Sequence, residues 1–455
     1  MDVVVTPSGS IEGRAVVPGD KSIAHRWLIL AATASGRSRL VGLPLSLDVG
    51  STAGCLAALT DKARPPLDVF AQKVASRVEG GGSTWNVQAE PSADPSLEVE
   101  GQGRDGLVRP VDRLDCGNSG TTMRLLAGVL AAAPFEVVLS GDGSLSSRPM
   151  ERVAEPLRTM GASVGTDEGH APLTVRGASL RGIRYEPQVP SAQVKSAVLL
   201  AGVAADGETA VAEPAQTRDH TERALAALGA PIETDPDGIR IRRYQHDGFD
   251  ARVPGDVSSA AFLLAAAAIT GSRLTIESVG INPSRLHYLE VMARMGIETT
   301  CAIEGTELGE PVGTISIEPC AEIMSVRVEP TELPLIIDEV PVLAALAAHA
   351  SSDSWFLDAA ELRVKESDRL QAITAGIRGM GGAAADEGVD LVIAGGGLDG
   401  GRVDARGDHR MAMAFAVAAL GARGASRIDG IEAANVSYPG FVASLRALGA
   451  DVEPA

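Results

Sequence analysis

Cations and hydroxyl groups gather where helices are expected to begin. Pro18-Gly-Asp-Lys-Ser places Lys21 and Ser22 in the first turn of a predicted helix, with Arg26 one turn beyond. The free N–H groups and the dipole of a helix start favour an anion. Gly117-Asn-Ser-Gly-Thr-Thr-Met-Arg is a second such start, but it lacks the spacing and lysine of a P-loop. Both segments are candidate anion sites, although a solvated, capped helix start would give the same pattern.

Charged residues also stand at the heads of a second set of predicted helices. Ser147-Arg-Pro-Met and Thr217-Arg-Asp-His-Thr-Glu each carry an arginine there, whose planar fork matches phosphate or carboxylate oxygens. The densest cluster is Val364-Lys-Glu-Ser-Asp-Arg, in which Glu366 and Arg369 are predicted to share one helix face. An exposed, salt-bridged helix would show the same cluster.

Two further helix starts complete the set. Asp338 precedes an alanine-rich run, and Asp408-His-Arg-Met-Ala-Met offers a histidine and an arginine. The polar residues at all these helix heads are Lys21, Ser22, Arg26, Arg124, Arg148, Ser191, Gln193, Arg218, Asp338, Lys365, Glu366, Arg369, His409 and Arg410. So many cations around two carboxylates exceed what one phosphate needs. They predict two anionic substrates held together, with Asp338 and Glu366 moving protons.

The elements that position these residues recur along the chain. Val17-Pro-Gly-Asp-Lys-Ser returns as Val253-Pro-Gly-Asp-Val-Ser, and each copy precedes an apolar block that stops at a glycine. The second copy replaces the charged residues of the first by Val257, Ala261 and Phe262. This difference indicates a duplicated unit that binds an anion on one side only.

The repetition continues on a finer scale. Alanine-rich helices are predicted to start near Lys21, Asn118, Ser191, Asp256, Asp338 and Asp408. Second helices are predicted over 48–59, 148–160, 218–228, 284–295, 365–380 and 438–448, five of them closed by Gly161, Gly229, Gly296, Gly381 and Gly449. Runs rich in β-branched residues, such as 239–243, 314–318 and 391–394, are predicted strands. The pattern predicts an α/β fold of six modules, three per half.

Composition limits the class of protein. A chain of 455 residues with 45% hydrophobic residues is expected to form two domains, each with its own core. The net charge of −19 and 3% aromatic residues argue against nucleic acid and against an anionic membrane surface. No apolar run approaches the roughly 20 residues that span a bilayer, and the N-terminus lacks signal-peptide features. We expect a cytoplasmic protein.

The four cysteines carry little information about function. Cys55, Cys116, Cys301 and Cys320 show no Cys-x-x-Cys spacing and no paired histidine, so neither a zinc site nor a disulfide framework is indicated. We expect no metal and no other cofactor. The least regular segment, 61–112, is predicted to be a decoration without a catalytic role, with turns at Arg64-Pro-Pro and Gly80-Gly-Gly and a possible strand over 85–89.

Six motifs, in order, resemble the signatures of the 5-enolpyruvylshikimate-3-phosphate synthase family. They are Pro18-Gly-Asp-Lys-Ser-Ile-Ala-His-Arg, Gly117-Asn-Ser-Gly-Thr-Thr-Met-Arg, Ser191-Ala-Gln-Val-Lys-Ser, Thr217-Arg-Asp-His-Thr-Glu, Val364-Lys-Glu-Ser-Asp-Arg and Asp408-His-Arg-Met-Ala-Met. The resemblance covers about 17–439. The fourth motif resembles the bacterial branch usually called class II, whereas the second is more similar to the other branch.

The resemblance implies an inside-out α/β barrel in each of two domains, with three modules per domain, helices inside and sheets outside. It places one domain at 1–19 and 253–455 and the other at 20–252, with hinges near Gly19 and Arg252. The implied reaction transfers the enolpyruvyl group of phosphoenolpyruvate to the 5-hydroxyl of shikimate 3-phosphate, in the shikimate pathway to chorismate and the aromatic amino acids. Both substrates are expected in the interdomain cleft, and a monomer is expected.

The resemblance also implies roles for single residues. Shikimate 3-phosphate would be bound by Lys21, Ser22, Arg26, Ser191, Ala192, Gln193, Arg218, Asp338 and Lys365. Phosphoenolpyruvate would be bound by Lys21, Gly120, Arg124, Arg148, Gln193, Arg369 and Arg410. Lys21 would take part in catalysis, with Asp338 as the base toward the hydroxyl and Glu366 as the acid toward the methylene carbon. Acid and base need opposite protonation at neutral pH, which the surrounding charges are expected to arrange.

Two departures from the family pattern affect these expectations. Val436 stands where one branch has a lysine before its Thr-Phe-Pro, so one phosphoenolpyruvate contact is missing or replaced. Gly120 leaves room for glyphosate, so at least moderate inhibition is expected, although Leu125 replaces the proline of sensitive forms.

Three alternatives to this function stay open. The sister enzyme that acts on UDP-N-acetylglucosamine shares the architecture, and Cys116 is a candidate for its catalytic thiol. However, Cys116 precedes the Asn-Ser-Gly motif rather than lying in a mobile loop, and the Lys-Glu-Ser-Asp-Arg motif resembles the shikimate enzyme. The acceptor could also be a different cyclitol of a specialised pathway. The last alternative is a non-catalytic paralogue that binds the same ligands.

Overall fold

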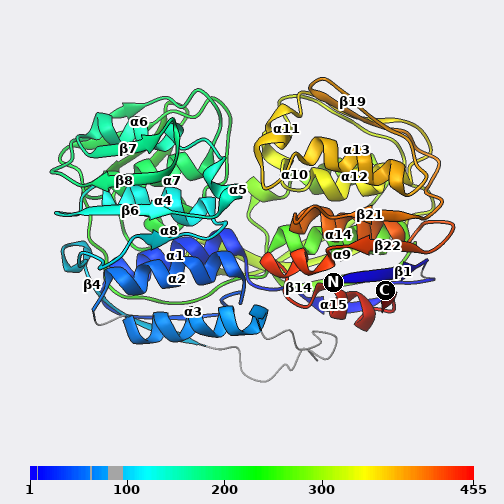
Figure 1. Cartoon of the computed structure of the whole chain (residues 1–455), viewed down its shortest axis with the longest axis horizontal. Helices are drawn as coiled ribbons and strands as arrows, with labels where there is room; N and C mark the ends of the chain where they lie inside the picture. Colours follow the sequence, from blue (N-terminus) through cyan, green and yellow to red (C-terminus); the bar gives the residue numbers. More distant parts are fainter. Residues whose placement is uncertain (8, 62–63, 80–95) are drawn as a thin grey trace.

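The computed structural model of the chain describes residues 1–7, 9–61, 64–79 and 96–455. Its buried hydrophobic residues form two clusters. Residues 3–17 and 257–452 build one, here called lobe one, and residues 23–253 build the other, called lobe two. Figure 1 shows the lobes side by side, with both chain termini in lobe one. The α/β class predicted from the sequence is confirmed, whereas the hinge positions at Gly19 and Arg252 stay a prediction.

The first helix of each module forms the centre of its lobe. These helices are α9 (Val257–Ile269), α12 (Val340–Ala348) and α14 (His409–Ala419) in lobe one, and α1 (Lys21–Thr33), α4 (Gly120–Leu130) and α7 (Ala192–Gly202) in lobe two. Every residue of α12 and α14 is buried. A Cβ on Gly128 of α4 would lie 2.3 Å from the Ala197 carbonyl oxygen in α7, so small residues permit the close helix packing.

The second helices are α2 (Leu47–Leu59), α6 (Glu151–Met160), α8 (His220–Ala227), α10 (His287–Arg294), α13 (Arg369–Gly379) and α15 (Phe441–Ala447). Five of them begin two to four residues later than predicted, at Glu151, His220, His287, Arg369 and Phe441. The five glycines predicted to close them, Gly161, Gly229, Gly296, Gly381 and Gly449, all have positive φ, which confirms that prediction. Two single-turn helices, α5 (Gly143–Ser146) and α11 (Leu333–Ile336), lie in connecting segments.

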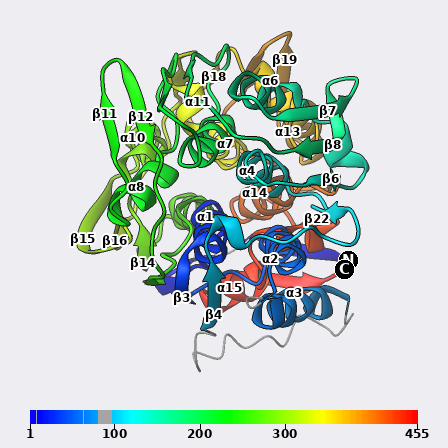
Figure 2. The same ribbon diagram turned by 90° about the vertical axis from the view of Figure 1, so that its left-hand side faces the viewer.

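Six sheets lie around the helices among the described residues (Figure 2). Lobe one has the orders β21-β22-β1-β23, β15-β16-β14-β2 and β17-β18-β20-β19. Its strands are β1 (Asp2–Thr6), β2 (Gly13–Val16), β14 (Leu274–Gly280), β15 (Thr299–Glu307), β16 (Glu310–Ile317), β17 (Arg327–Val328), β18 (Ser354–Phe356), β19 (Ala384–Glu387), β20 (Asp390–Ile393), β21 (Arg402–Asp404), β22 (Ser426–Asp429) and β23 (Asp451–Pro454). Each sheet joins one parallel pair to antiparallel neighbours, as β2, β14 and β16 illustrate.

Lobe two repeats this plan with the orders β11-β12-β10-β9, β5-β6-β8-β7 and β13-β3-β4. Its strands are β3 (Ser35–Val41), β4 (Leu97–Gln102), β5 (Leu114–Asp115), β6 (Glu136–Ser140), β7 (Ser163–Asp167), β8 (His170–Arg176), β9 (Arg184–Tyr185), β10 (Glu208–Val211), β11 (Ile232–Asp235), β12 (Gly238–Arg242) and β13 (Asp250–Arg252). One sheet per predicted module supports the sixfold repeat found in the sequence.

The two copies of the repeated Val-Pro-Gly-Asp segment lie against each other where the chain passes between the lobes. The Asp20 amide donates to the Pro254 carbonyl at 2.7 Å, and the Asp256 amide donates to the Pro18 carbonyl at 2.8 Å. The aspartate amide of each copy therefore donates to the proline carbonyl of the other copy. The sequence repeat is an approximate twofold relation in space.

The segment at 61–112 differs from the expectation. The prediction of turns at Arg64-Pro-Pro was wrong, because α3 (Arg64–Glu79) starts there and packs along α2 at the base of lobe two (Figure 1). Proline is well tolerated in the first turn of a helix, where its missing N–H has no partner to lose. The turn at Gly80 and the strand predicted over 85–89 lie outside the described residues.

Candidate functional site

A cavity of about 460 Å³ lies between the lobes and gathers most of the predicted site residues. Its lining includes Lys21, Ser22, Gly120, Arg124, Arg148, Ser191, Ala192, Gln193, Arg218, Asp338, Lys365, Glu366 and Arg410, together with His409. The cations are thus brought together from both lobes rather than scattered. The structure places these side chains where two anionic molecules could lie side by side.

Two predicted site residues are buried behind the lining. Arg26 donates from Nη1 to the Ser22 carbonyl at 2.8 Å and from Nε to Thr221 Oγ1 at 2.8 Å. Arg369 is fully buried and donates from Nη2 to Glu366 Oε2 at 2.6 Å. Both therefore adjoin residues of the cavity, but neither side chain lines it.

Four buried helices begin at the cavity, and each has a side-chain cap. Asp20 accepts from the Ile23 amide at 2.9 Å, Ser119 from Thr122 at 3.1 Å, Ser191 from Val194 at 3.3 Å and Asp408 from Arg410 at 2.9 Å. Such caps satisfy amide groups that the first turn of a helix leaves without partners. The remaining free amides and the helix dipoles point positive ends at the cleft.

Two of the second helices contribute through the loops before them rather than through their first turns. α8 begins at His220 and α13 at Arg369, so Arg218, Lys365 and Glu366 precede their helices. The prediction that Glu366 and Arg369 share a helix face was therefore wrong. Asp368 caps α13 and ends the loop, which leaves Glu366 free to turn back onto Arg369.

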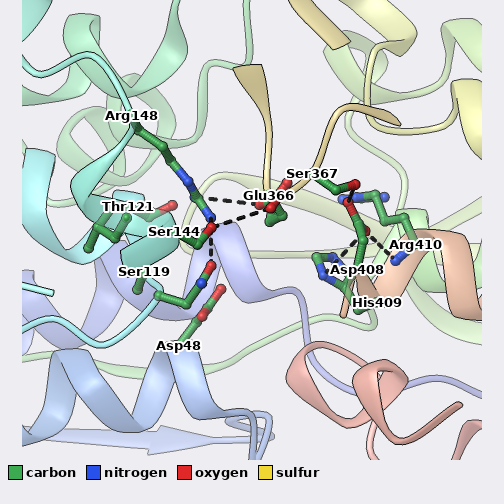
Figure 3. A network of polar contacts seen from close by, with 12 residues as sticks. Asp48, Ser119, Thr121, Ser144, Arg148, Glu366, Ser367, Asp408, His409 and Arg410 are labelled. Atoms are coloured by element: carbon green, nitrogen blue, oxygen red, sulfur yellow. Dashed lines mark hydrogen bonds and ion pairs between the residues drawn. The ribbon is translucent and has the colours of Figure 1, made fainter. Parts of the chain in front are cut away.

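Ion pairs cross the cleft with arginines on lobe two and carboxylates on lobe one. Arg148 Nη1 lies 3.7 Å from Glu366 Oε1, and Ser144 Oγ donates to the Glu366 carbonyl at 3.3 Å. Arg218 forms a short ion pair with Asp338. Figure 3 shows Arg148 extending toward Glu366, with Asp408, His409 and Arg410 on the far side of that carboxylate.

The surrounding charge sets the ionisation of both carboxylates. Burial alone would raise the pKa of Asp338, but Arg410 and Arg218 hold it well below its ordinary value. Burial likewise opposes ionisation of Glu366, yet Arg369 and Arg148 lower its pKa well below the ordinary value. The expected opposite protonation is not found, because cations surround both groups and both are ionised.

The proposed phosphoenolpyruvate corner is built from two arginines and a glycine. Arg148 Nη2 donates to Asn118 Oδ1 at 2.5 Å, and Arg124 donates to Gln193 and, from Nη2, to the Pro149 carbonyl at 3.1 Å. Burial, with Arg148 nearby, lowers the pKa of Arg124 to about 10, so it stays charged at neutral pH. A Cβ on Gly120 would lie 3.1 Å from Arg124 Nη1 and 3.4 Å from Arg148 Nη1. Glycine keeps this corner open to a ligand.

Several cavity residues were missed or not assigned a role from the sequence. Lys21 Nζ pairs with Asp48 Oδ2 at 2.9 Å, and Arg152 Nη1 pairs across the cleft with Glu361 Oε1 at 3.1 Å. Asp48 begins a predicted second helix, as Arg148 and Arg218 do, and that position was its signal. His409 belongs to the lining, and burial with Lys21 nearby lowers its pKa to about 3, so its ring is neutral.

The described ranges contain neither a cluster typical of a metal site nor a helix typical of a membrane span. No group of three or more His, Cys, Asp or Glu side chains there is arranged to hold a metal ion. Among the helices of those residues, none has the length and apolar character needed to cross a membrane.

Comparison with known proteins agrees with the geometry. The model of the family described as EPSP synthase (3-phosphoshikimate 1-carboxyvinyltransferase) matches residues 5–79 and 85–445. A protein of Acidithiobacillus ferrooxidans named 3-phosphoshikimate 1-carboxyvinyltransferase is 44% identical over 457 residues, covering 99% of each chain. A protein of the same name from Thermus thermophilus is 45% identical over 97% of each chain.

Solved structures agree as well. The chain superposes on an EPSP synthase of Acinetobacter baumannii with a TM-score of 0.83 and 36% identity over the full length of both chains. The fold, the cleft and the full-length matches lead to one conclusion: this chain belongs to the EPSP synthase family, the 3-phosphoshikimate 1-carboxyvinyltransferases.

Proposed function

We propose that the cleft transfers the enolpyruvyl group of phosphoenolpyruvate to the 5-hydroxyl of shikimate 3-phosphate and releases phosphate. The observation that carries this proposal is the convergence of cations from both lobes around Asp338 and Glu366 in one cavity. Two anionic substrates balance that charge. The reaction serves chorismate and aromatic amino acid biosynthesis.

Shikimate 3-phosphate takes the side of the cleft near Lys21 and Arg218. Ser22, Ser191 and Gln193 offer hydroxyl and amide groups there, and the Ala192 amide lies in the first turn of α7. Lys365 and Asp338 face this side from lobe one. Arg26 supports it from behind through its bond to the Ser22 carbonyl.

Phosphoenolpyruvate takes the corner formed by Gly120, Arg124 and Arg148. Arg410 faces this corner from lobe one, on the far side of Glu366, where its Nη1 donates to the Asp338 carbonyl at 2.7 Å. Arg369 acts from behind the lining by holding Glu366 in place. Lys21, bridged to Asp48, stands between the two substrates and can contact both.

The chemistry needs one base and one acid in each half of the reaction. Asp338 accepts the proton of the 5-hydroxyl as its oxygen bonds to C2 of phosphoenolpyruvate, and Glu366 donates a proton to C3. In the elimination Glu366 takes a proton back from C3, and the proton held by Asp338 leaves with phosphate. Arg369 and, next, Arg148 lower the Glu366 pKa; phosphoenolpyruvate bound at Arg148 would offset that cation's share, which favours protonation of Glu366.

Closure of the lobes about hinges at Gly19 and Arg252 would exclude water from this intermediate. The chain passes between the lobes twice, and the two segments are hydrogen-bonded to each other, so a hinge there would consist of two chain segments. We also propose that the protein acts as a monomer in the cytoplasm.

The sister reaction on UDP-N-acetylglucosamine is less well supported. It would require a reactive thiol, but a hydrogen bond with Cys55 and burial raise the pKa of Cys116 well above its ordinary value. The test is phosphate release from phosphoenolpyruvate with each acceptor in turn. Phosphate release that depends on shikimate 3-phosphate supports the proposal. Release that occurs only with UDP-N-acetylglucosamine, or no release with either acceptor, refutes it.

A further inference from the structure

The tip of the β15–β16 hairpin, residues Glu307 to Glu310, belongs to lobe one but is attached to lobe two. Glu307 Oε2 accepts from the Arg252 amide at 3.1 Å, and Leu308 packs against the hydrophobic cluster of lobe two. The Gly309 carbonyl accepts from Arg223 Nη1 at 3.3 Å. Figure 2 shows this hairpin reaching the neighbourhood of α8.

Glu310 makes the most buried of these contacts. It is fully buried, and its Oε1 lies 2.7 Å from His220 Nδ1, itself 1% exposed. Its Oε2 accepts from Asn282 Nδ2 at 2.9 Å. A buried carboxylate whose two oxygens both have partners holds a fixed geometry, because moving it would leave a charge without hydrogen bonds.

Asp219 adds a second attachment beside His220. Its Oδ1 accepts from Asn282 Nδ2 at 2.7 Å and from Ser284 Oγ at 3.1 Å, both in lobe one. Its Oδ2 accepts from Arg223 Nε at 2.8 Å. Asn282 therefore bridges Asp219 and Glu310, and the two contacts form one hydrogen-bonded unit.

Arg218 is the residue immediately before this unit. Its guanidinium reaches Asp338 and, through Nη1, Ser22 Oγ at 3.4 Å. It lies in the loop before α8 rather than in a helix, so its backbone needs another support. Asn282, Ser284 and Glu310 of the opposite lobe provide that support through Asp219 and His220.

We propose that Asp219, His220, Asn282, Ser284 and Glu310 form an interlobe joint that positions Arg218 for shikimate 3-phosphate. These are positioning residues, since they touch neither substrate nor the reacting atoms. The proposal rests on the proposed function for the ligand of Arg218. The joint itself does not depend on it.

The test compares Glu310→Ala with Glu310→Gln and with a control on the same hairpin. Glutamine can still accept from Asn282 and donate to a neutral His220 ring, so it should rescue the joint. Glu304→Ala is the control, because Glu304 is exposed and its Oε1 accepts from Thr314 within the hairpin. Calorimetric titration gives the shikimate 3-phosphate dissociation constant, and steady-state rates give kcat and the phosphoenolpyruvate KM.

Glu310→Ala should weaken shikimate 3-phosphate binding by about 10- to 100-fold, the size of effect expected when a positioning group shifts by about 1 Å. The phosphoenolpyruvate KM should change by less than about 3-fold, and Glu310→Gln and Glu304→Ala should bind normally. In an Arg218→Ala background, Glu310→Ala should add less than about 3-fold, since both changes remove one function. The proposal would be overturned if the losses in shikimate 3-phosphate affinity from Arg218→Ala and Glu310→Ala were additive. It would also be overturned if Glu310→Ala weakened binding of both substrates equally.

Hydrogen exchange supplies a readout that needs no substrate. Peptides covering 217–223 should exchange faster in Glu310→Ala than in the wild type or Glu304→Ala, while those covering α1 stay unchanged. Unchanged exchange at 217–223 would refute the joint even in an active enzyme. If the wild type shows no turnover but Glu310→Ala still exchanges faster at 217–223, the proposed function is refuted and the joint is supported. If Glu310→Ala does not fold, Asn282→Ala takes its place in every arm.

Discussion

Replacing Arg369 by methionine should destabilise lobe one without changing its shape. The side chain is 1% exposed, and Nε donates to Asp408 Oδ2 at 2.9 Å while Nη2 donates to Glu366 at 2.6 Å. Methionine fills similar space but leaves Asp408, which is fully buried, without its cation. Losing one partner of a buried pair costs about 3–5 kcal/mol. For a lobe of this size that loss lowers Tm by roughly 6–20 °C.

The pH dependence carries the sharper part of this prediction. In the wild type Arg369 lowers the pKa of Asp408 against the effect of burial, so the carboxylate stabilises the fold above its ordinary pKa and less below it. In the variant Arg369 no longer opposes burial, so the pKa of Asp408 rises and the folded state takes up a proton at a higher pH than the wild type does. The gap in unfolding free energy between the two proteins should therefore narrow from pH 8 toward pH 5.

Urea unfolding followed by circular dichroism measures that gap at each pH. A second change, Asp408→Asn, should recover part of the loss at pH 8, because asparagine still caps α14 but carries no charge. A loss below about 1 kcal/mol at pH 8 would show that the pair contributes little, against the cost expected for a buried pair. A gap that widens on acidification would show that the sign of the argument is wrong.

Three further changes probe the cleft. Asp338→Ala should cut kcat by about 10²- to 10⁴-fold while the shikimate 3-phosphate dissociation constant stays within about 5-fold, and a near-normal kcat would remove its role as base. Gly120→Ala should raise the phosphoenolpyruvate KM and weaken inhibition by glyphosate, because the new Cβ would lie 3.1 Å from Arg124 Nη1; unchanged values in a titration of both would contradict the crowding. Below about pH 4.5 the unfolding free energy of the wild type should fall more steeply with decreasing pH than that of Glu366→Gln. The reason is that the pKa of Glu366 is depressed in the folded state, so the unfolded chain takes up the proton first. Parallel curves of unfolding free energy against pH would argue against that shift.

The helices at the centre of each lobe could be predicted from the sequence because their signals are local. Alanine-rich runs preceded by Asp20, Ser191 or Asp408 combine a cap with a buried helix, and all three caps are made. The sequence repeat also predicted how the helices pair into modules. Resemblance to a family then supplied roles that periodicity cannot give.

The misses have physical causes that a single sequence does not display. α3 was predicted as irregular because Arg64-Pro-Pro favours a turn as readily as a helix start, and only its packing on α2 decides between them. Glu366 was placed on a helix face because charge spacing suits a helix, whereas the Asp368 cap delays the start of α13. The contact between His220 and Glu310 joins residues 90 positions apart and has no local signal.

The ion pairs across the cleft suggest how binding and chemistry are linked. Arg410 and Arg218 lower the pKa of Asp338, and Arg369 and Arg148 lower that of Glu366. Arg218 and Arg148 reach these carboxylates from lobe two, where an anionic substrate would also engage them. A phosphate that binds Arg218 draws it away from Asp338, which raises the basicity of that carboxylate beside the hydroxyl it must deprotonate. Phosphoenolpyruvate at Arg148 acts on Glu366 in the same way and lets it hold a proton. The cations that bind the substrates would therefore also contribute to the protonation of the acid and the base, so that substrate binding and proton transfer are coupled.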